Sequence, residues 1–171
     1  FMELCAGGSL GSHLRTTYRS GLPHASLHRY GRDLLCGLHF LHENMIIHRD
    51  LKPGNILVSA DGERLLPRVI DFGIAKALDP DLIGTGSVTV EGQFLGTPHY
   101  MSPEQIREGV VVTPQTDLWS VGVVLFEALS GKVPFAPAEQ DKIKILMAVM
   151  GDQVAPELPD IIDEVLSLIH I

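Results

Sequence analysis

Apolar residues recur at helical spacing over two long stretches of the chain. Between residues 25 and 43 they return every three or four positions, which predicts an amphipathic helix. The stretch from 115 to 129 is more uniformly apolar and predicts a buried helix that Ser130-Gly131 ends. The apolar positions of the first stretch are Leu27, Tyr30, Leu34, Leu35, Leu38 and Leu41.

Shorter signals place four further helices. Ser9 is suited to cap a helix that runs to about residue 18. A short helix is expected after Ser102-Pro103-Glu104, and an amphipathic helix over residues 141–150. After a proline-marked linker, a last helix is expected from Asp160.

The strand signals are few and short. Residues 1–5 form an apolar, strand-like run, and residues 46–47 and 56–58 are strand candidates. A turn signal at residues 60–63 returns the chain through residues 68–70, which predicts a hairpin. The fold class expected from these patterns is mainly α, with one small β-hairpin.

Length and charge limit the classes of protein. The 171 residues, 45% of them hydrophobic, suffice for one domain with a core of its own. The formal net charge is -8 and no basic run occurs, which excludes nucleic acid as the main partner. The longest apolar stretch, from Val121 to Phe126 and on past Glu127, is too short to span a bilayer.

Two cysteines, Cys5 and Cys36, lack the spacing of a metal site. We expect them to be buried free thiols of a reducing compartment. The location predicted is therefore cytoplasmic, with any membrane anchor of the parent protein outside this chain.

Candidate chemistry lies in the segment His48-Arg49-Asp50-Leu51-Lys52-Pro53-Gly54-Asn55 and in Asp71-Phe72-Gly73. Asp50 is suited to accept the proton of a substrate hydroxyl, and Lys52 to contact a transferring phosphate. Asn55 and Asp71 offer the oxygen ligands that Mg²⁺ prefers. This order of groups is typical of phosphoryl transfer.

These motifs, with the segments 96–104 and 117–122, resemble eukaryotic-like (Hanks-type) Ser/Thr protein kinases of the bacterial type. The resemblance covers residues 1 to about 165. It implies the C-terminal lobe of a two-lobed α+β domain, preceded by the hinge between the lobes. It also implies ATP and Mg²⁺, with Mn²⁺ as a substitute, and proteins carrying Ser or Thr as substrates.

The resemblance assigns the adenine side of the nucleotide site to the start of the chain. Met2 would be the gatekeeper, and the Glu3 carbonyl and Cys5 amide would face the adenine. Leu57 would form the floor of the adenine pocket, and Ser9 would lie near the ribose.

The resemblance also identifies an activation segment. Thr97 would hydrogen-bond Asp50 and Lys52, which suits a Ser/Thr kinase. Thr89 falls where related bacterial kinases carry a phosphothreonine, and we hypothesise that its phosphate pairs with Arg49. A solvated, unmodified Thr89 is the alternative.

Two residues are expected to have structural roles. By the family pattern, His48 packs in the core and bonds backbone near Asp71, and Asp117 bonds the backbone of the Asp50 loop. The family pairs the equivalent of Glu104 with an arginine. No Lys or Arg follows Lys144, so Glu104 is expected to lack that partner.

The ends of the chain carry a further expectation. Residues 1–165 are interpreted as a fragment without the N-terminal lobe and the distal helices, and this fragment alone is expected to be marginally folded and inactive. Residues 166–171 resemble the translation of a sequencing-library adapter, with a native helix end as the alternative.

Two other functions stay open. A pseudokinase or scaffold would need a lesion elsewhere, because Asp50, Asn55 and Asp71 are all present. A small-molecule phosphotransferase of related fold would lack the segment from Asp71 to Glu104 that approaches a peptide site.

Overall fold

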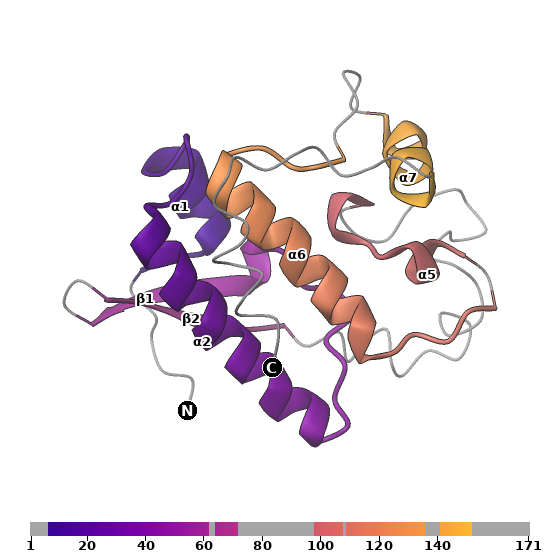
Figure 1. Cartoon of the computed structure of the whole chain (residues 1–171), viewed down its shortest axis with the longest axis horizontal. Helices are drawn as coiled ribbons and strands as arrows, with labels where there is room; N and C mark the ends of the chain where they lie inside the picture. Colours follow the sequence, from indigo (N-terminus) through magenta and orange to yellow (C-terminus); the bar gives the residue numbers. More distant parts are fainter. Residues whose placement is uncertain (1–6, 62–63, 72–97, 108, 136–140, 152–171) are drawn as a thin grey trace.

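The computed structural model describes residues 7–61, 64–71, 98–107, 109–135 and 141–151 (Figure 1). Helices dominate this part of the chain, and its one sheet has two strands. The predicted fold class, mainly α with a small β-hairpin, is confirmed. The helices and strands are α1 (Leu10–Thr16), α2 (His24–Glu43), η1 (Pro53–Asn55), β1 (Ile56–Asp61), β2 (Arg64–Val69), η2 (Pro98–Tyr100), α5 (Pro103–Ile106), α6 (Pro114–Ser130) and α7 (Lys142–Met150).

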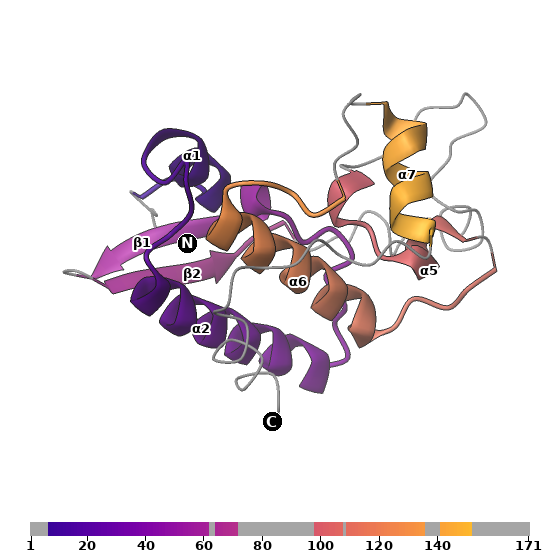
Figure 2. The ribbon, with the colours of Figure 1, turned by 45° about the horizontal axis from the view of Figure 1, so that its top comes forward.

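The core forms where α2 meets α6 and the hairpin. The two long helices lie side by side in both views of the ribbon, and the hairpin packs against α2 (Figures 1 and 2). Every third or fourth residue of α2 is buried, as its apolar spacing predicts. The buried side chains of these two helices include Leu27, Tyr30, Leu34, Leu38, Val121, Val124, Leu125 and Ala128.

Helix α1 begins at the predicted cap. The Ser9 side chain accepts a hydrogen bond from the Ser12 amide at 3.2 Å, and the helix ends at Thr16, two residues before the predicted end. An isolated bridge joins Ser9 to Leu57, so the start of α1 is fixed to β1. A Cβ atom on Gly7 would lie 1.8 Å from the Val58 carbonyl oxygen, so only glycine fits this close approach.

The hairpin pairs β1 with β2 in antiparallel register from Ile56 opposite Val69 to Asp61 opposite Arg64. Both predicted strands are confirmed, and the predicted turn residues 62–63 lie outside the described residues. Gly131 ends α6 with φ 70°, the left-handed conformation that glycine adopts most easily.

Two predictions about burial and strand structure are wrong. Residues 46–47 form no strand, because the Ile46 amide bonds the Leu41 carbonyl at 2.9 Å and closes the end of α2. Cys36 is exposed, because it lies on the solvent side of α2.

Some predictions fall on other parts of the chain. The strand at residues 1–5, Cys5, most of the 74–101 loop and the helix from Asp160 lie outside the described residues. Within the described residues, no helix is long and apolar enough to cross a membrane.

Candidate active site

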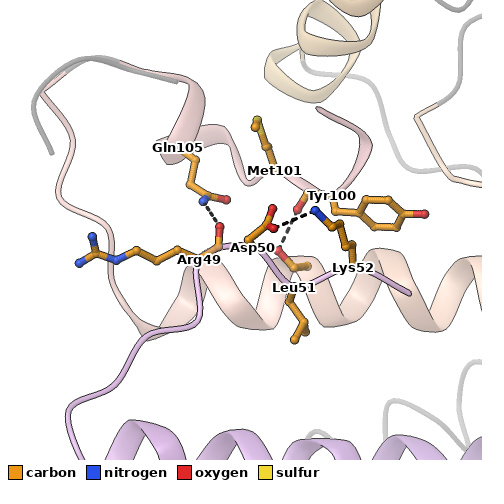
Figure 3. Close-up of a pocket in the computed structure, with 8 residues that line it drawn as sticks. Arg49, Asp50, Leu51, Lys52, Tyr100, Met101 and Gln105 are labelled. Atoms are coloured by element: carbon orange, nitrogen blue, oxygen red, sulfur yellow. Dashed lines mark hydrogen bonds and ion pairs between the residues drawn. The ribbon is translucent and has the colours of Figure 1, made fainter. Parts of the chain in front are cut away.

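The Asp50 side chain is the centre of the candidate site (Figure 3). The Lys52 ammonium donates to Asp50 Oδ2 at 2.8 Å, and Asn55 Nδ2 donates to the same oxygen at 3.1 Å. Asn55 Nδ2 also bonds the Asp50 carbonyl at 2.8 Å. The structure therefore brings together the three residues that the sequence predicts to be catalytic.

A single turn of 3₁₀-helix makes this convergence possible. Pro53 is the first residue of η1, where its fixed φ and missing N–H are tolerated. The Asn55 amide bonds the Lys52 carbonyl at 2.9 Å, and this turn directs the Asn55 side chain back to Asp50.

The backbone before Asp50 is held by a carboxylate from α6. Asp117 is fully buried, and its Oδ2 and Oδ1 accept the amides of His48 and Arg49, both at 2.9 Å. This confirms the predicted role of Asp117. A buried carboxylate needs such donors, because an uncompensated charge in the interior is costly.

The sequence prediction missed His42, which lies in the last turn of α2. Its Nε2 atom is 2.8 Å from Asp117 Oδ2, so the carboxylate has three donors. The available signal was a histidine at a helix C-terminus, where the helix dipole favours a cation, six residues before His48.

His48 connects the site to the end of the hairpin. It is fully buried, and its Nε2 donates to the Ile70 carbonyl at 2.9 Å while its Nδ1 accepts from the Asp50 amide at 3.3 Å. These two bonds require the tautomer with hydrogen on Nε2. The structural role predicted for His48 is confirmed.

Asn55 and Asp71 are the predicted metal ligands. The Ile70 amide bonds the Asn55 carbonyl at 2.9 Å, which brings Asp71 close to the Asn55 backbone, and the Asp71 side chain is exposed. Both side-chain hydrogen bonds of Asn55 to Asp50 are made by Nδ2, so Oδ1 is the atom that could bind a cation. No cluster of three His, Cys, Asp or Glu side chains that could hold a metal occurs in the described ranges. Mg²⁺ needs no such cluster, since one or two protein oxygens with phosphate and water suffice.

Three of the residues predicted to bind ATP can be placed, namely Asp71, Ser9 and Leu57. Ser9 and Leu57 face each other across the isolated bridge, and Leu57 is half-buried. The Ser9 oxygen accepts the cap bond, and a hydroxyl in that role can still donate its own hydrogen. Met2, Glu3, Cys5, Thr89 and Thr97 lie outside the described residues.

Glu104 has a partner that the sequence did not predict. Thr116 Oγ1 donates to Glu104 Oε1 at 2.6 Å. Burial acts to raise the pKa of Glu104, but the hydrogen bonds from Thr116, its own backbone and Ser102, with the Arg107 charge, outweigh it and lower the pKa. The expectation concerned an arginine partner only, and the hydrogen bond from the Thr116 hydroxyl was not predicted.

Replacing Thr116 with valine should lower the free energy of unfolding by about 1 kcal/mol at pH 7. The pKa of Glu104 is lower in the folded state than in the unfolded state, so its ionised form stabilises the fold above the unfolded-state pKa. This contribution is lost as the pH falls through the folded-state pKa. The deficit of the variant should therefore shrink toward acid pH. Urea denaturation at pH 7 and at about pH 4 measures the deficit, and the second value is chosen because it lies near the ordinary pKa of a carboxylate.

Thr113→Val is the matched control for that measurement, because Thr113 makes no side-chain cap bond. This substitution should change the free energy of unfolding little at either pH. An equal deficit for Thr116→Val at both values would contradict the assignment of the Glu104 partner.

Tyr100 lies at the pocket beside Asp50 and has two polar partners. Its hydroxyl donates to Glu127 Oε2 at 2.6 Å, and Ser120 Oγ donates to its carbonyl at 2.8 Å. Burial, then the bond to Glu127 and the charge of that carboxylate, raise the pKa of Tyr100. The sequence prediction did not identify this pair.

A small pocket beside Asp50 is lined by Arg49, Asp50, Leu51, Lys52, Tyr100, Met101, Gln105 and Ser120 (Figure 3).

Comparison with known proteins decides the family. The profile described as "Protein kinase domain" matches residues 1–170. The chain belongs to the protein kinase domain family. Proteins of this family generally use ATP and a divalent metal, and the mainly helical lobe with its hairpin agrees with this membership.

Several relatives of this kinase domain are named as protein kinases. It is 39% identical over 172 residues to "Serine/threonine-protein kinase PknA" of Mycobacterium tuberculosis, covering 99% of this chain and 36% of the relative. It is 38% identical over 160 residues to "Mitogen-activated protein kinase kinase kinase 1" of Mus musculus, covering 93% of this chain and 10% of the relative. "Mitogen-activated protein kinase kinase 2" of Arabidopsis thaliana is 36% identical over 163 residues, covering 92% of this chain and 42% of the relative. The chain thus spans less than half the length of each of these relatives.

Proposed function

We propose that the full-length protein is a Ser/Thr protein kinase that transfers the γ-phosphate of ATP to protein hydroxyls. The observation that supports this most directly is the convergence of Lys52 and Asn55 on the Asp50 carboxylate. A hydroxyl positioned by Asp50 would attack the γ-phosphorus in line. The bond from substrate oxygen to phosphorus forms as the bond to ADP breaks, and Asp50 accepts the hydroxyl proton.

The other residues act on charge and position. Lys52 offsets the negative charge that accumulates on the transferring group. Asn55 Oδ1 and the exposed Asp71 carboxylate would hold Mg²⁺, which neutralises the phosphates when bound. Ser9 and Leu57, with Met2, Glu3 and Cys5, would line the nucleotide site. The proposal also includes a hydrogen bond from Thr97 to Asp50 and Lys52, and a phosphate on Thr89 that pairs with Arg49. It includes a cytoplasmic location as well.

The proposal is tested with the full-length protein, ATP, Mg²⁺ and peptide pools that carry only Ser, only Thr or only Tyr as acceptor. We expect phosphate on the Ser and Thr pools, and no transfer when EDTA removes the metal. Tight ATP binding without transfer would favour the pseudokinase alternative. Turnover of small alcohols but not peptides would favour the small-molecule phosphotransferase.

Asn55→Ser should raise the Mg²⁺ concentration for half-maximal rate about tenfold, equivalent to about 1.4 kcal/mol. The reason is that the shorter side chain removes one oxygen from the proposed metal site and the bonds of Nδ2 to Asp50. A Mg²⁺ titration at saturating ATP measures the shift. Asn44→Ser, at the exposed C-cap of α2, is the control and should leave the titration unchanged. An unchanged titration for Asn55→Ser would remove Asn55 from the metal site.

A further inference from the structure

Both the oxygen and the nitrogen of the Gln105 side-chain amide make hydrogen bonds to backbone. Gln105 is the third residue of α5, and its Oε1 accepts the Ser102 amide at 3.1 Å in a capping box. Its Nε2 donates to the Arg49 carbonyl at 2.8 Å, across 56 positions of sequence. Figure 3 shows Gln105 reaching from α5 to the backbone just before Asp50.

The carbonyl that Gln105 binds belongs to a strained residue. Arg49 has φ 65°, in the left-handed region that a side chain other than glycine adopts only when its surroundings hold it there. Asp117 holds the Arg49 amide at 2.9 Å. Gln105 therefore fixes the other side of the same residue.

The peptide bond between Arg49 and Asp50 is thus held at two points. Its carbonyl accepts from Gln105, and its N–H donates to His48 Nδ1 at the longer distance of 3.3 Å. The orientation of this peptide sets the direction in which the Asp50 Cα–Cβ bond leaves the backbone. Loss of the shorter bond would remove the restraint on the carbonyl side of the peptide and leave the longer bond of the Asp50 N–H.

We propose that Gln105 is a positioning residue for Asp50, connecting the capped start of α5 to the strained backbone of Arg49. This inference rests on the proposed kinase function for its catalytic consequence. An amide suits the position because it combines an acceptor for the cap with a donor for the Arg49 carbonyl. A carboxylate would keep the cap and lose the donor.

Gln105→Glu in the full-length protein is the variant that separates the two ends of the amide. Glutamate at this position preserves the capping box, so α5 should stay folded. Its carboxylate faces the Arg49 carbonyl without a hydrogen to donate. We expect kcat to fall about tenfold to a hundredfold, because small misplacements of a catalytic group carry losses of this size. The KM values for ATP and peptide should stay within about threefold of wild type, since both ends of the Gln105 amide bond protein backbone.

Gln115→Glu is the matched control. Gln115 is exposed in the first turn of α6, so the same chemical change is made at a helix start away from Asp50. Its kcat should equal that of wild type. Gln105→Met removes both the donor and the cap acceptor without adding charge, and should lower kcat in the same direction as Gln105→Glu.

Hydrogen exchange gives a second readout that does not need activity. The amides of His48, Arg49 and Asp50 should exchange faster in Gln105→Glu than in wild type or Gln115→Glu. If wild type transfers no phosphate to peptides, the proposed function fails, and exchange alone decides whether Gln105 holds this loop. Unchanged exchange, unchanged kcat in both Gln105 variants, or loss of fold in both would overturn the inference.

Discussion

Asp50→Asn should lower kcat for peptide phosphorylation about 10²-fold to 10⁴-fold, the range that a positioned acid or base contributes. The asparagine cannot accept the proton of the substrate hydroxyl. Its side-chain oxygen still offers Lys52 and Asn55 an acceptor, which the wild-type carboxylate provides at 2.8 and 3.1 Å. The fold and the affinity for nucleotide should therefore persist. Steady-state kinetics and calorimetric titration with ADP measure the two effects separately.

Glu43→Gln is the control for the loss of a carboxylate, because Glu43 is exposed at the end of α2. It should leave kcat unchanged. An Asp50→Asn enzyme that retains more than about a tenth of wild-type kcat would remove Asp50 from the acid–base role. Loss of ADP binding in the variant would instead show that Asp50 supports the nucleotide site.

Asp117→Ala should be the most destabilising of the substitutions considered, at about 3–5 kcal/mol. The carboxylate is fully buried and accepts bonds from His42, His48 and Arg49. Its removal leaves buried donors without an acceptor, and each such group carries a desolvation cost. The melting temperature of the full-length protein should fall by roughly 6–20 °C. Calorimetry and urea denaturation measure the change.

A graded series tests the origin of that loss. His42→Ala removes one of the three donors and leaves the two backbone bonds of Asp117 in place, so it should cost less than Asp117→Ala. Any Asp117→Ala protein that stays folded should also have a reduced kcat, because the Arg49 amide loses its hydrogen bond to the Asp117 carboxylate. A change in unfolding free energy below about 1 kcal/mol for Asp117→Ala would contradict the anchoring role.

Much of the fold could be predicted from the pattern of apolar residues. Helices α2 and α6 appear within one residue of the predicted bounds, because α2 carries an apolar stripe of helical period and α6 is apolar over most of its length. The hairpin could be predicted from a turn signal between two short strand patterns. Short apolar runs carry less information. Residues 46–47 resemble a strand in isolation, but the Ile46 amide bonds the end of α2.

The candidate site divides in the same way. Asp50, Lys52 and Asn55 are close in sequence, so a local turn brings them together and the motif was sufficient to predict the cluster. Long-range partners were harder to predict. The contacts of His42 with Asp117 and of Gln105 with Arg49 span 75 and 56 positions, and neither pair has a local spacing that would identify it.

The family and the helical and hairpin segments could be predicted from residue type and short-range spacing alone, and the same motifs predict the roles of Asp50 and Asp71. The groups that hold the loop of residues 48–55 became evident only from the packed fold. Thr116 as the partner of Glu104, and Gln105 behind Asp50, depend on how α5 and α6 pack around residues 48–55. The reason is physical: a buried polar group takes whichever donor or acceptor the packed fold brings within about 3 Å, and sequence distance does not limit that choice.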